Sequence, residues 1–257
     1  MGCLLGADGA LRPVSGIGGA MLAGAPAVSG VISAACSNSF ALVKTAGSVE
    51  VLDSGLGLLA QWDAPAGPAL FALPPTGQIG FAYFAATGQL VQVDAQSSPR
   101  AVLDSQSLGG DVLAIASPDV SHVIAVVAET AGPCLVRISA VDGTIESQAP
   151  LEDAGAPLAL LSDGTVVFAD GAGLTIRPPG AGAQLLAQPE SRLPVGKGQA
   201  AAAGEWRLGL PSPAVAIDQM SGSWLAVRLA NSSAPVALRP AAGPQRGYRV
   251  PALEMAP

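Results

Sequence analysis

Short apolar segments bounded by turn residues recur along this chain roughly every forty positions. The first segments of successive units begin near residues 31, 69, 111 and 156, at intervals of 38, 42 and 45 residues. Each segment is rich in Val, Ala and Ile, is too short for a helix and is followed by Gly, Pro, Ser or Asp, which is typical of β-strands. Such units can bury their apolar faces only against neighbouring units.

Each unit contains four predicted strands separated by turns. The predicted strands are 31–36, 40–43, 48–53 and 58–62; 69–73, 79–84, 89–94 and 100–103; 111–116, 122–127, 134–138 and 144–146; and 156–161, 165–168, 174–177 and 184–187. The pattern weakens over 188–212, where we expect a shortened blade or an insertion. It returns at 214–217, 224–229 and 236–239, and the last strand candidate is 248–250.

Four strands per unit at this period predict an all-β fold, a β-propeller of four-stranded antiparallel blades. We expect about six blades, with five to seven as the range, in a single domain over residues 1–257. The first two strands of each unit are apolar throughout and should lie buried between blades. A ring must join its ends, so we expect residues 10–17 to complete the last blade by pairing with strands from 214–250.

Several turns carry a resemblance to a known family. Ser117-Pro118-Asp119 and Ser162-Asp163-Gly164 follow first strands, and Val93-Asp94 and Leu52-Asp53 end third strands. The units resemble bacterial propeller repeats of the YVTN type, and the opening and closing segments look like uncharacterised propeller proteins of soil bacteria. The resemblance implies the fold and export from the cytoplasm, but no activity. Similarity to WD40 repeats is poorer, because the one Trp-Asp pair, Trp62-Asp63, falls on a fourth strand.

The net charge of −7 argues against a general nucleic-acid binder, since contacts to phosphates drive that affinity. The charge is unevenly distributed. Residues 1–190 hold 5 basic and 16 acidic side chains, whereas residues 191–257 hold 7 basic and 3 acidic ones. We interpret the basic part as a solvated face. The expected partner is an unknown protein or small ligand, and we expect a monomer.

Neither a membrane span nor a targeting segment is recognisable. The chain has no stretch of 18 apolar residues, so a transmembrane helix is not expected. The N-terminus lacks the charge and apolar core of a signal peptide, and Gly6 stands where myristoylation requires Ser or Thr. The localisation is therefore left open, and only the family resemblance favours a place outside the cytoplasm.

The three cysteines, Cys3, Cys36 and Cys134, have no CxxC spacing. A zinc or redox site is therefore not expected. We interpret them as small buried apolar residues, with a single disulfide as the alternative that spacing does not decide.

Three sequence features could suggest a cofactor site or nucleophilic catalysis, but the residues around each of them argue against it. The run Gly55-Leu-Gly57-Leu-Leu-Ala60 matches a dinucleotide motif, but Pro65 and Pro68 leave no room for the helix that such a site needs. Gly196-Lys197-Gly198 lacks the rest of a phosphate-binding loop. His122 is the only histidine and begins an apolar strand, so we expect a partly buried structural imidazole. We predict no cofactor, no metal ion and no catalytic residue.

Aspartate residues are the candidates for an enzymatic alternative. Asp104, Asp111 and Asp119 lie around the start of the third unit and are interpreted as solvated or turn-capping acids. The Asp-Gly pairs at 8–9, 142–143, 163–164 and 170–171 are expected to be turns. We therefore expect a non-enzymatic scaffold that binds a partner through top-face loops or at the channel mouth. The alternative is a carboxylate-based hydrolase or lyase with its site at the channel, which would need convergent acids with raised pKa values.

Overall fold

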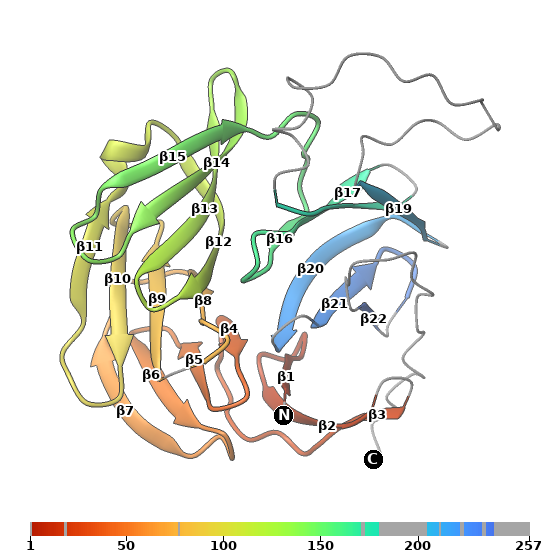
Figure 1. The fold of residues 1–257 in the computed structure, drawn as a ribbon. Coiled ribbons are helices and arrows are strands. Elements are labelled where there is room, and N and C mark those ends of the chain that lie inside the picture. Colours follow the sequence, from red (N-terminus) through yellow and green to blue (C-terminus); the bar gives the residue numbers. More distant parts are fainter. Residues whose placement is uncertain are drawn as a thin grey trace.

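The computed structural model of the protein describes residues 2–17, 20–76, 78–170, 173–179, 205–210, 212–221, 224–232 and 235–238. These residues form six antiparallel sheets arranged around a ring (Figure 1). In the described ranges, four of the sheets have four strands and two have three. The predicted all-β propeller is confirmed, with a number of sheets inside the expected range.

The strands follow one another around the ring in chain order. The first sheet is β1 (Gly2–Leu5), β2 (Leu11–Ile17) and β3 (Ala20–Ala23); the second is β4 (Ser33–Cys36), β5 (Phe40–Lys44), β6 (Ser48–Asp53) and β7 (Leu58–Asp63); the third is β8 (Ala69–Ala72), β9 (Ile79–Phe84), β10 (Gln89–Asp94) and β11 (Arg100–Asp104). The fourth sheet is β12 (Asp111–Asp119), β13 (His122–Glu129), β14 (Gly132–Ser139) and β15 (Ile145–Pro150); the fifth is β16 (Leu158–Leu160), β17 (Val166–Asp170), β18 (Gly173–Arg177) and β19 (Trp206–Gly209); the sixth is β20 (Ala214–Ser221), β21 (Trp224–Leu229) and β22 (Val236–Leu238). A short 3-10 helix, η1 (Ser105–Leu108), joins the third and fourth sheets.

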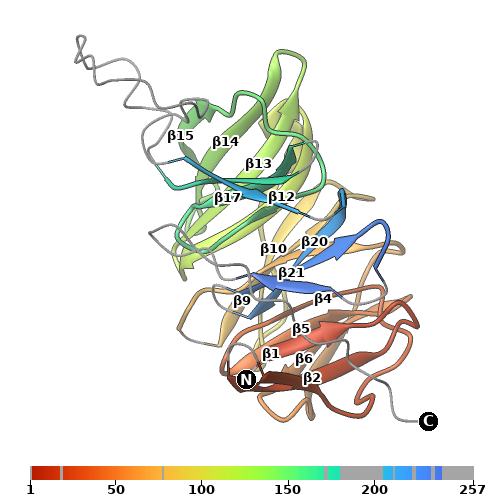
Figure 2. The same ribbon diagram turned by 90° about the vertical axis from the view of Figure 1, so that its right-hand side faces the viewer.

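The innermost strands β4, β8, β12, β16 and β20 contact one another in turn, and β20 also contacts β4. The first sheet packs where β20 meets β4, because β1 contacts both of these strands. Figure 2 shows β20 and β21 lying between β1–β2 on one side and β17 on the other. The ring is thus closed by packing between sheets.

Burial falls from the inside of each sheet to the outside. Every residue of β5 is buried, whereas every residue of β15 is exposed. On β14 buried and partly buried residues alternate, as expected for a strand with one wet face. Clusters of apolar side chains fill the spaces between neighbouring sheets; one joins Phe40 and Leu42 of the second sheet to Phe71, Ala82 and Phe84 of the third. The second strands β5, β9 and β13 are covered on both faces, as expected, but the first strands are covered only in part, since Leu113 of β12 is 38% exposed and Val215 of β20 is 57% exposed.

The pairing predicted for residues 10–17 was wrong. These residues form β2, which pairs with β1 on one edge and with β3 on the other, so neither edge is free for a strand from 214–250. The local reason is the turn at Gly6–Ala10. Gly9 adopts a φ of 70°, which glycine reaches without strain, and lets the chain fold back on itself as a hairpin.

Two other details of the prediction were also wrong. The outer edge of β18 pairs with β19, so residues 206–209 take the place expected for 184–187. The segment Ser117-Pro118-Asp119 is part of β12, and the turn follows it at residues 120–121. The irregular segment expected over 188–212 lies largely outside the described residues, as does the strand candidate 248–250.

Cys3 and Cys36 form a disulfide that joins β1 to the end of β4, while Cys134 is a buried free thiol. All three cysteines are buried, as expected, and the alternative of one disulfide, which the sequence left open, is correct. Sequence spacing could not decide this, because the two residues are 33 positions apart and meet only when the first and second sheets pack together.

Lys44, at the end of β5, is fully buried, and its Nζ donates hydrogen bonds to the carbonyl oxygens of Thr45, at 2.6 Å, and Ala46, at 3.4 Å. Burial lowers the pKa of this ammonium because it penalises the charged form. Among the described residues no carboxylate lies within ion-pair distance of it. The cost of burying the charge is therefore only partly offset.

We expect Lys44→Met to stabilise the fold by about 1 kcal/mol at neutral pH, because it removes a desolvated charge from an apolar site. The two carbonyl groups belong to an accessible turn and can bond to water instead. Since folding lowers the pKa, the penalty is present below the ordinary pKa of lysine and fades as the pH rises towards it. Urea melts at pH 7 and pH 10 measure this difference. A variant that is less stable than wild type at pH 7, or a gain that grows with pH, would contradict it.

Candidate functional site

Three charged side chains gather around His122 in the fourth sheet. His122 opens β13 directly after the turn from β12, and its Nδ1 lies 2.8 Å from Oδ1 of Asp119. Its Nε2 lies 3.4 Å from Oε1 of Glu146, and Oε2 of Glu146 accepts a hydrogen bond of 2.9 Å from Nε of Arg137. A neutral imidazole can donate to only one of the two carboxylates, whereas an imidazolium donates to both.

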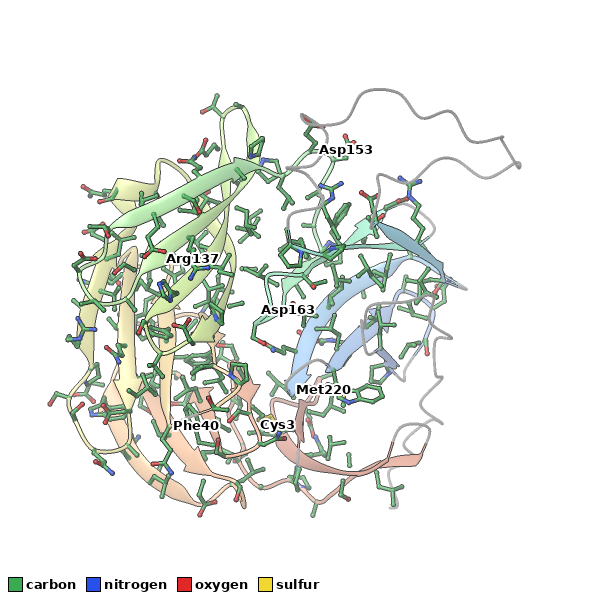
Figure 3. All side chains as sticks on the ribbon, in the orientation of Figure 1. Cys3, Phe40, Arg137, Asp153, Asp163 and Met220 are labelled. Carbon is green, nitrogen blue, oxygen red and sulfur yellow. A yellow bond between two sulfur atoms is a disulfide. The ribbon has the colours of Figure 1, made fainter. Side chains whose placement is uncertain are left out.

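The pleat of the sheet decides which way this cluster faces. Arg137 on β14 stands opposite Ile124 on β13, and Ile124 packs in an apolar cluster with Phe168 of β17. Arg137 therefore lies on the side of the fourth sheet that faces the fifth, where Figure 3 shows it across from Asp163. The imidazole of His122 keeps 26% of its surface exposed, so the predicted partly buried histidine is confirmed.

Asp119 is held in its charged form. Burial raises the pKa of Asp119, but hydrogen bonds from the Ser121 amide and from His122 outweigh this effect, and the pKa lies below its ordinary value. Asp142, in the next turn at the same end of the sheet, also has a lowered pKa, because Ser139 and Thr144 donate hydrogen bonds to it. These acids are suited to fixing turns and pairing with cations.

The turn between β14 and β15 is clamped onto the third sheet. Arg100 of β11 donates hydrogen bonds to the carbonyl oxygens of Ala140, at 2.7 Å, and Val141, at 3.3 Å. Gly143 has a φ of 74°, and a Cβ there would lie 2.3 Å from the carbonyl oxygen of Val102, so no larger residue fits without a shift of backbone. A hydrogen bond of 2.7 Å from the Ala140 amide to the carbonyl of Ser121 ties this turn to the turn before His122.

Three apolar side chains at this end of the sheet are exposed to solvent. Val120 is 42% exposed, Val141 is 71% exposed and Ile145 is 41% exposed. These three residues and the charged cluster lie on both sides of the fourth sheet at one of its ends, where the Ala140 amide bonds to Ser121, and we call this end the His122 face. Its members are Asp119, Val120, His122, Arg137, Val141, Ile145 and Glu146. Exposed apolar groups on a fixed backbone, beside charges, are typical of sites that bind other proteins.

The other two predicted carboxylates do not join Asp119. Asp104 caps η1 by accepting a hydrogen bond of 3.0 Å from the Gln106 amide. Asp111 and Asp119 stand at opposite ends of the nine-residue strand β12, and at about 3.3 Å per residue they are roughly 26 Å apart. The structure therefore places Asp119 far from Asp111, while Asp104 and Asp111 flank η1.

The glycine-rich motif serves as a turn. The amides of Gly55 and Gly57 each donate a hydrogen bond of 2.8 Å to Oδ1 of Asp53, and β7 follows where a dinucleotide site would need a helix. Gly196-Lys197-Gly198 lies outside the described residues. The Asp-Gly pairs at 8–9, 142–143 and 163–164 are turns with glycine at positive φ, as predicted.

The free thiol of Cys134 is poorly suited to nucleophilic chemistry. Burial and a hydrogen bond to Glu129 raise the pKa of Cys134 to about 11, so the thiolate is scarce at neutral pH. In the part of the chain that is described, no group of three or more His, Cys, Asp or Glu side chains is placed to hold a metal ion.

A second set of ion pairs lies on the fifth sheet. Arg177 donates a hydrogen bond of 3.0 Å to Oε2 of Glu205, whose side chain is only 8% exposed. The guanidinium of Arg177 also stacks over the ring of Phe168 at 5.3 Å and donates to the carbonyl of Glu152. These contacts bind the fifth sheet to the connection that follows β15, which is a structural role.

Sequence reasoning singled out His122 and Asp119 but missed Arg137 and Glu146. The available signal was weak. Arg137 interrupts an otherwise apolar strand, and Glu146 follows the next turn by a few residues. Cross-strand neighbours in a hairpin can be aligned from the sequence once its turn is located, but the bulge between Arg137 and Ile138 shifts this register.

Comparison with known proteins supports the fold. No family model matches the chain, and no curated protein matches it. A crystal structure of a nidogen/laminin complex matches with a TM-score of 0.57 and 14% identity, covering 93% of this chain and 89% of that one. Hsv2 of Kluyveromyces lactis matches with a TM-score of 0.47 and 10% identity, covering 88% of this chain and 76% of that one.

In the ranges that the structure describes, no helix has the length and apolar character needed to cross a bilayer. At identities this low the likeness to solved structures concerns the fold alone. The chain is thus an all-β protein with the fold of a β-propeller.

Proposed function

We propose that the protein is a non-enzymatic scaffold that binds a partner protein through the His122 face. The observation that carries the proposal is Val141, which is 71% exposed on a turn that Arg100 and Gly143 fix against the neighbouring sheet. An exposed apolar side chain on a fixed backbone costs little conformational entropy to bind. One solved structure of similar fold comes from a nidogen/laminin complex, which supports such a role.

The charges beside Val141 would supply specificity. Glu146 and Asp119 face His122, and Arg137 neutralises only part of the negative charge. A partner with a basic side chain next to an apolar one would match this surface. Residues 1–190, which hold most of the acidic groups, favour the same kind of partner.

We also propose that residues 1–257 form one propeller domain that acts as a monomer outside the cytoplasm. The Cys3–Cys36 disulfide supports an oxidising compartment, where such bonds persist. The resemblance to YVTN-type repeats of bacteria supports the same assignment. The alternative, a carboxylate-based hydrolase or lyase, gains no support from Asp104, Asp111 and Asp119, which are far apart or engaged in turns.

Substituting Val141 tests the proposed surface. We expect Val141→Glu to reduce capture of the wild-type binding partner at least tenfold, because it places a charge where an apolar contact is needed. Partners enriched from the native host by immobilised wild-type protein are quantified by mass spectrometry for each variant. Val215→Glu is the matched control, because Val215 is 57% exposed on β20 of the sixth sheet. Equal capture by Val141→Glu and wild type, or no enriched partner, would refute the proposal.

A further inference from the structure

The one histidine of the chain lies in the His122 face. His122 is the only histidine among the 257 residues, and histidine is the side chain that ordinarily changes charge between pH 5 and 8. Asp119 stays charged in this range, because burial raises its pKa by less than its hydrogen bonds lower it. A change of charge at this face near neutral pH is therefore expected at His122.

The two ring nitrogens of His122 have unequal partners. Nδ1 lies 2.8 Å from Oδ1 and 2.9 Å from Oδ2 of Asp119, whereas Nε2 lies 3.4 Å from Oε1 of Glu146. A neutral imidazole carries one ring proton, and the shorter contacts assign it to Nδ1, which donates it to Asp119. The neutral form thus leaves the lone pair of Nε2 facing a carboxylate oxygen, with no proton between these two acceptors.

Glu146 is held on its other side and remains accessible. Its Oε2 accepts a hydrogen bond of 2.9 Å from Nε of Arg137, so Oε1 is the oxygen that faces the imidazole. The side chain of His122 is 26% exposed and that of Glu146 is 36% exposed. A donor group of a partner can therefore approach Nε2 and Oε1 together.

The charges around this pair favour a cation. On the fourth sheet, Arg137 offsets one of the two acids beside His122. The fifth sheet packs against the same side of the fourth, and its Asp163 lies across from Arg137 (Figure 3). The other charged side chains of the fifth sheet form two ion pairs among themselves, Arg177 with Glu205 and Arg207 with Asp170. With a neutral imidazole the surroundings are therefore acidic.

We infer that a proton and a basic group of the partner compete for the position between Nε2 of His122 and Oε1 of Glu146, so that acidification releases the partner. This inference rests on the proposed binding role of the His122 face. A lysine ammonium or an arginine guanidinium has several N–H donors and can bond to both acceptors when the imidazole is neutral. Once Nε2 carries a proton, it donates that proton to Glu146, and the charged ring repels a second cation.

The release is tested on the protein that the immobilised wild-type chain retains through Val141. We expect its affinity for the wild-type chain to fall at least about fivefold between pH 7.5 and pH 5.5, as measured by calorimetry at constant ionic strength. His122→Gln carries no charge at either pH, so its affinity should change less than about twofold. An unchanged affinity of the wild type, or an equal fall in His122→Gln, would overturn the inference.

Glu146→Gln distinguishes this inference from the proposed function. It removes the charge that attracts the partner's basic group, so the affinity at pH 7.5 should fall at least about fivefold. Glu152→Gln is the matched control, because Glu152 is exposed and follows the opposite end of β15. Full affinity of Glu146→Gln together with lost affinity of Val141→Glu would overturn the inference and leave the proposed binding surface intact.

A second measurement needs no partner. In the wild-type protein at pH 5.5 we expect NMR signals from both ring N–H protons of His122, because bonds to Asp119 and Glu146 slow their exchange with water. At pH 7.5 only the Nδ1 proton should remain, and Glu146→Ala should lose the Nε2 signal at pH 5.5. An Nε2 proton that is invisible in the wild type at pH 5.5, or unaffected by Glu146→Ala, would overturn the inference whatever the partner is.

Discussion

Val126→Asp is expected to unfold the protein at room temperature. Val126 is fully buried on β13, in an apolar cluster that joins the fourth sheet to the fifth through Ala114, Leu160 and Phe168. An unpaired carboxylate at this place would cost more than about 4 kcal/mol, which is a large part of the stability of a typical domain. Circular dichroism and a urea titration of the purified variant measure the loss.

The control is the same substitution at an exposed position near the same strand. Val120 is 42% exposed in the turn before β13, so Val120→Asp should change the free energy of unfolding by less than about 0.5 kcal/mol. A native-like melt of Val126→Asp would show that β13 is not covered on both faces. The assignment of residues 122–127 as the buried second strand of a repeat unit would then be wrong.

Removing the Cys3–Cys36 disulfide is expected to destabilise the fold by about 3–4 kcal/mol. The cross-link closes a loop with a sequence separation of 33, and the chain entropy that it removes from the unfolded state has this size. It also pins β1 to β4 at the seam of the ring, so its loss should affect the first sheet before the others. Denaturant melts of the double variant Cys3→Ala, Cys36→Ala measure the effect.

Reduction of the wild-type protein provides an independent check. A reducing agent should lower the midpoint of the wild-type melt towards that of the double variant and should leave the double variant itself unchanged. Cys134 is a buried free thiol and should not contribute to this difference. Coincident melts of oxidised and reduced wild-type protein would contradict the stabilising role of the bond.

Most strand positions could be predicted from the sequence alone. The structure confirms β6, β9, β10 and β21 over the predicted residues, and most of the other strands differ by a few positions. The reason is that apolar runs and turn residues are local properties of the chain, set by backbone sterics at Gly and Pro and by side-chain burial. The strands β1 and β3 were missed because each has four residues and only weak turn signals around it.

The candidate site could be predicted only in part. His122 and Asp119 are close in sequence, so a tight turn between two strands was enough to bring them together. Arg137 and Glu146 joined them because β14 and β15 fold back onto β13, with a bulge that shifts the register by one residue. A shift of one residue moves a side chain to the other face of the sheet, and the sequence does not reveal it.

The sequence by itself determined the class of fold, the number of strands per blade and the places where turns interrupt them. The tertiary structure decided the pairing of β2 with β1 and β3, the Cys3–Cys36 bond, the position of β19 in the fifth sheet and the composition of the His122 face. Local steric and hydrophobic preferences act over a few residues and can be read from the chain. The pairing of segments dozens of residues apart depends on which packed arrangement buries the most apolar surface, and only the folded ring fixes it.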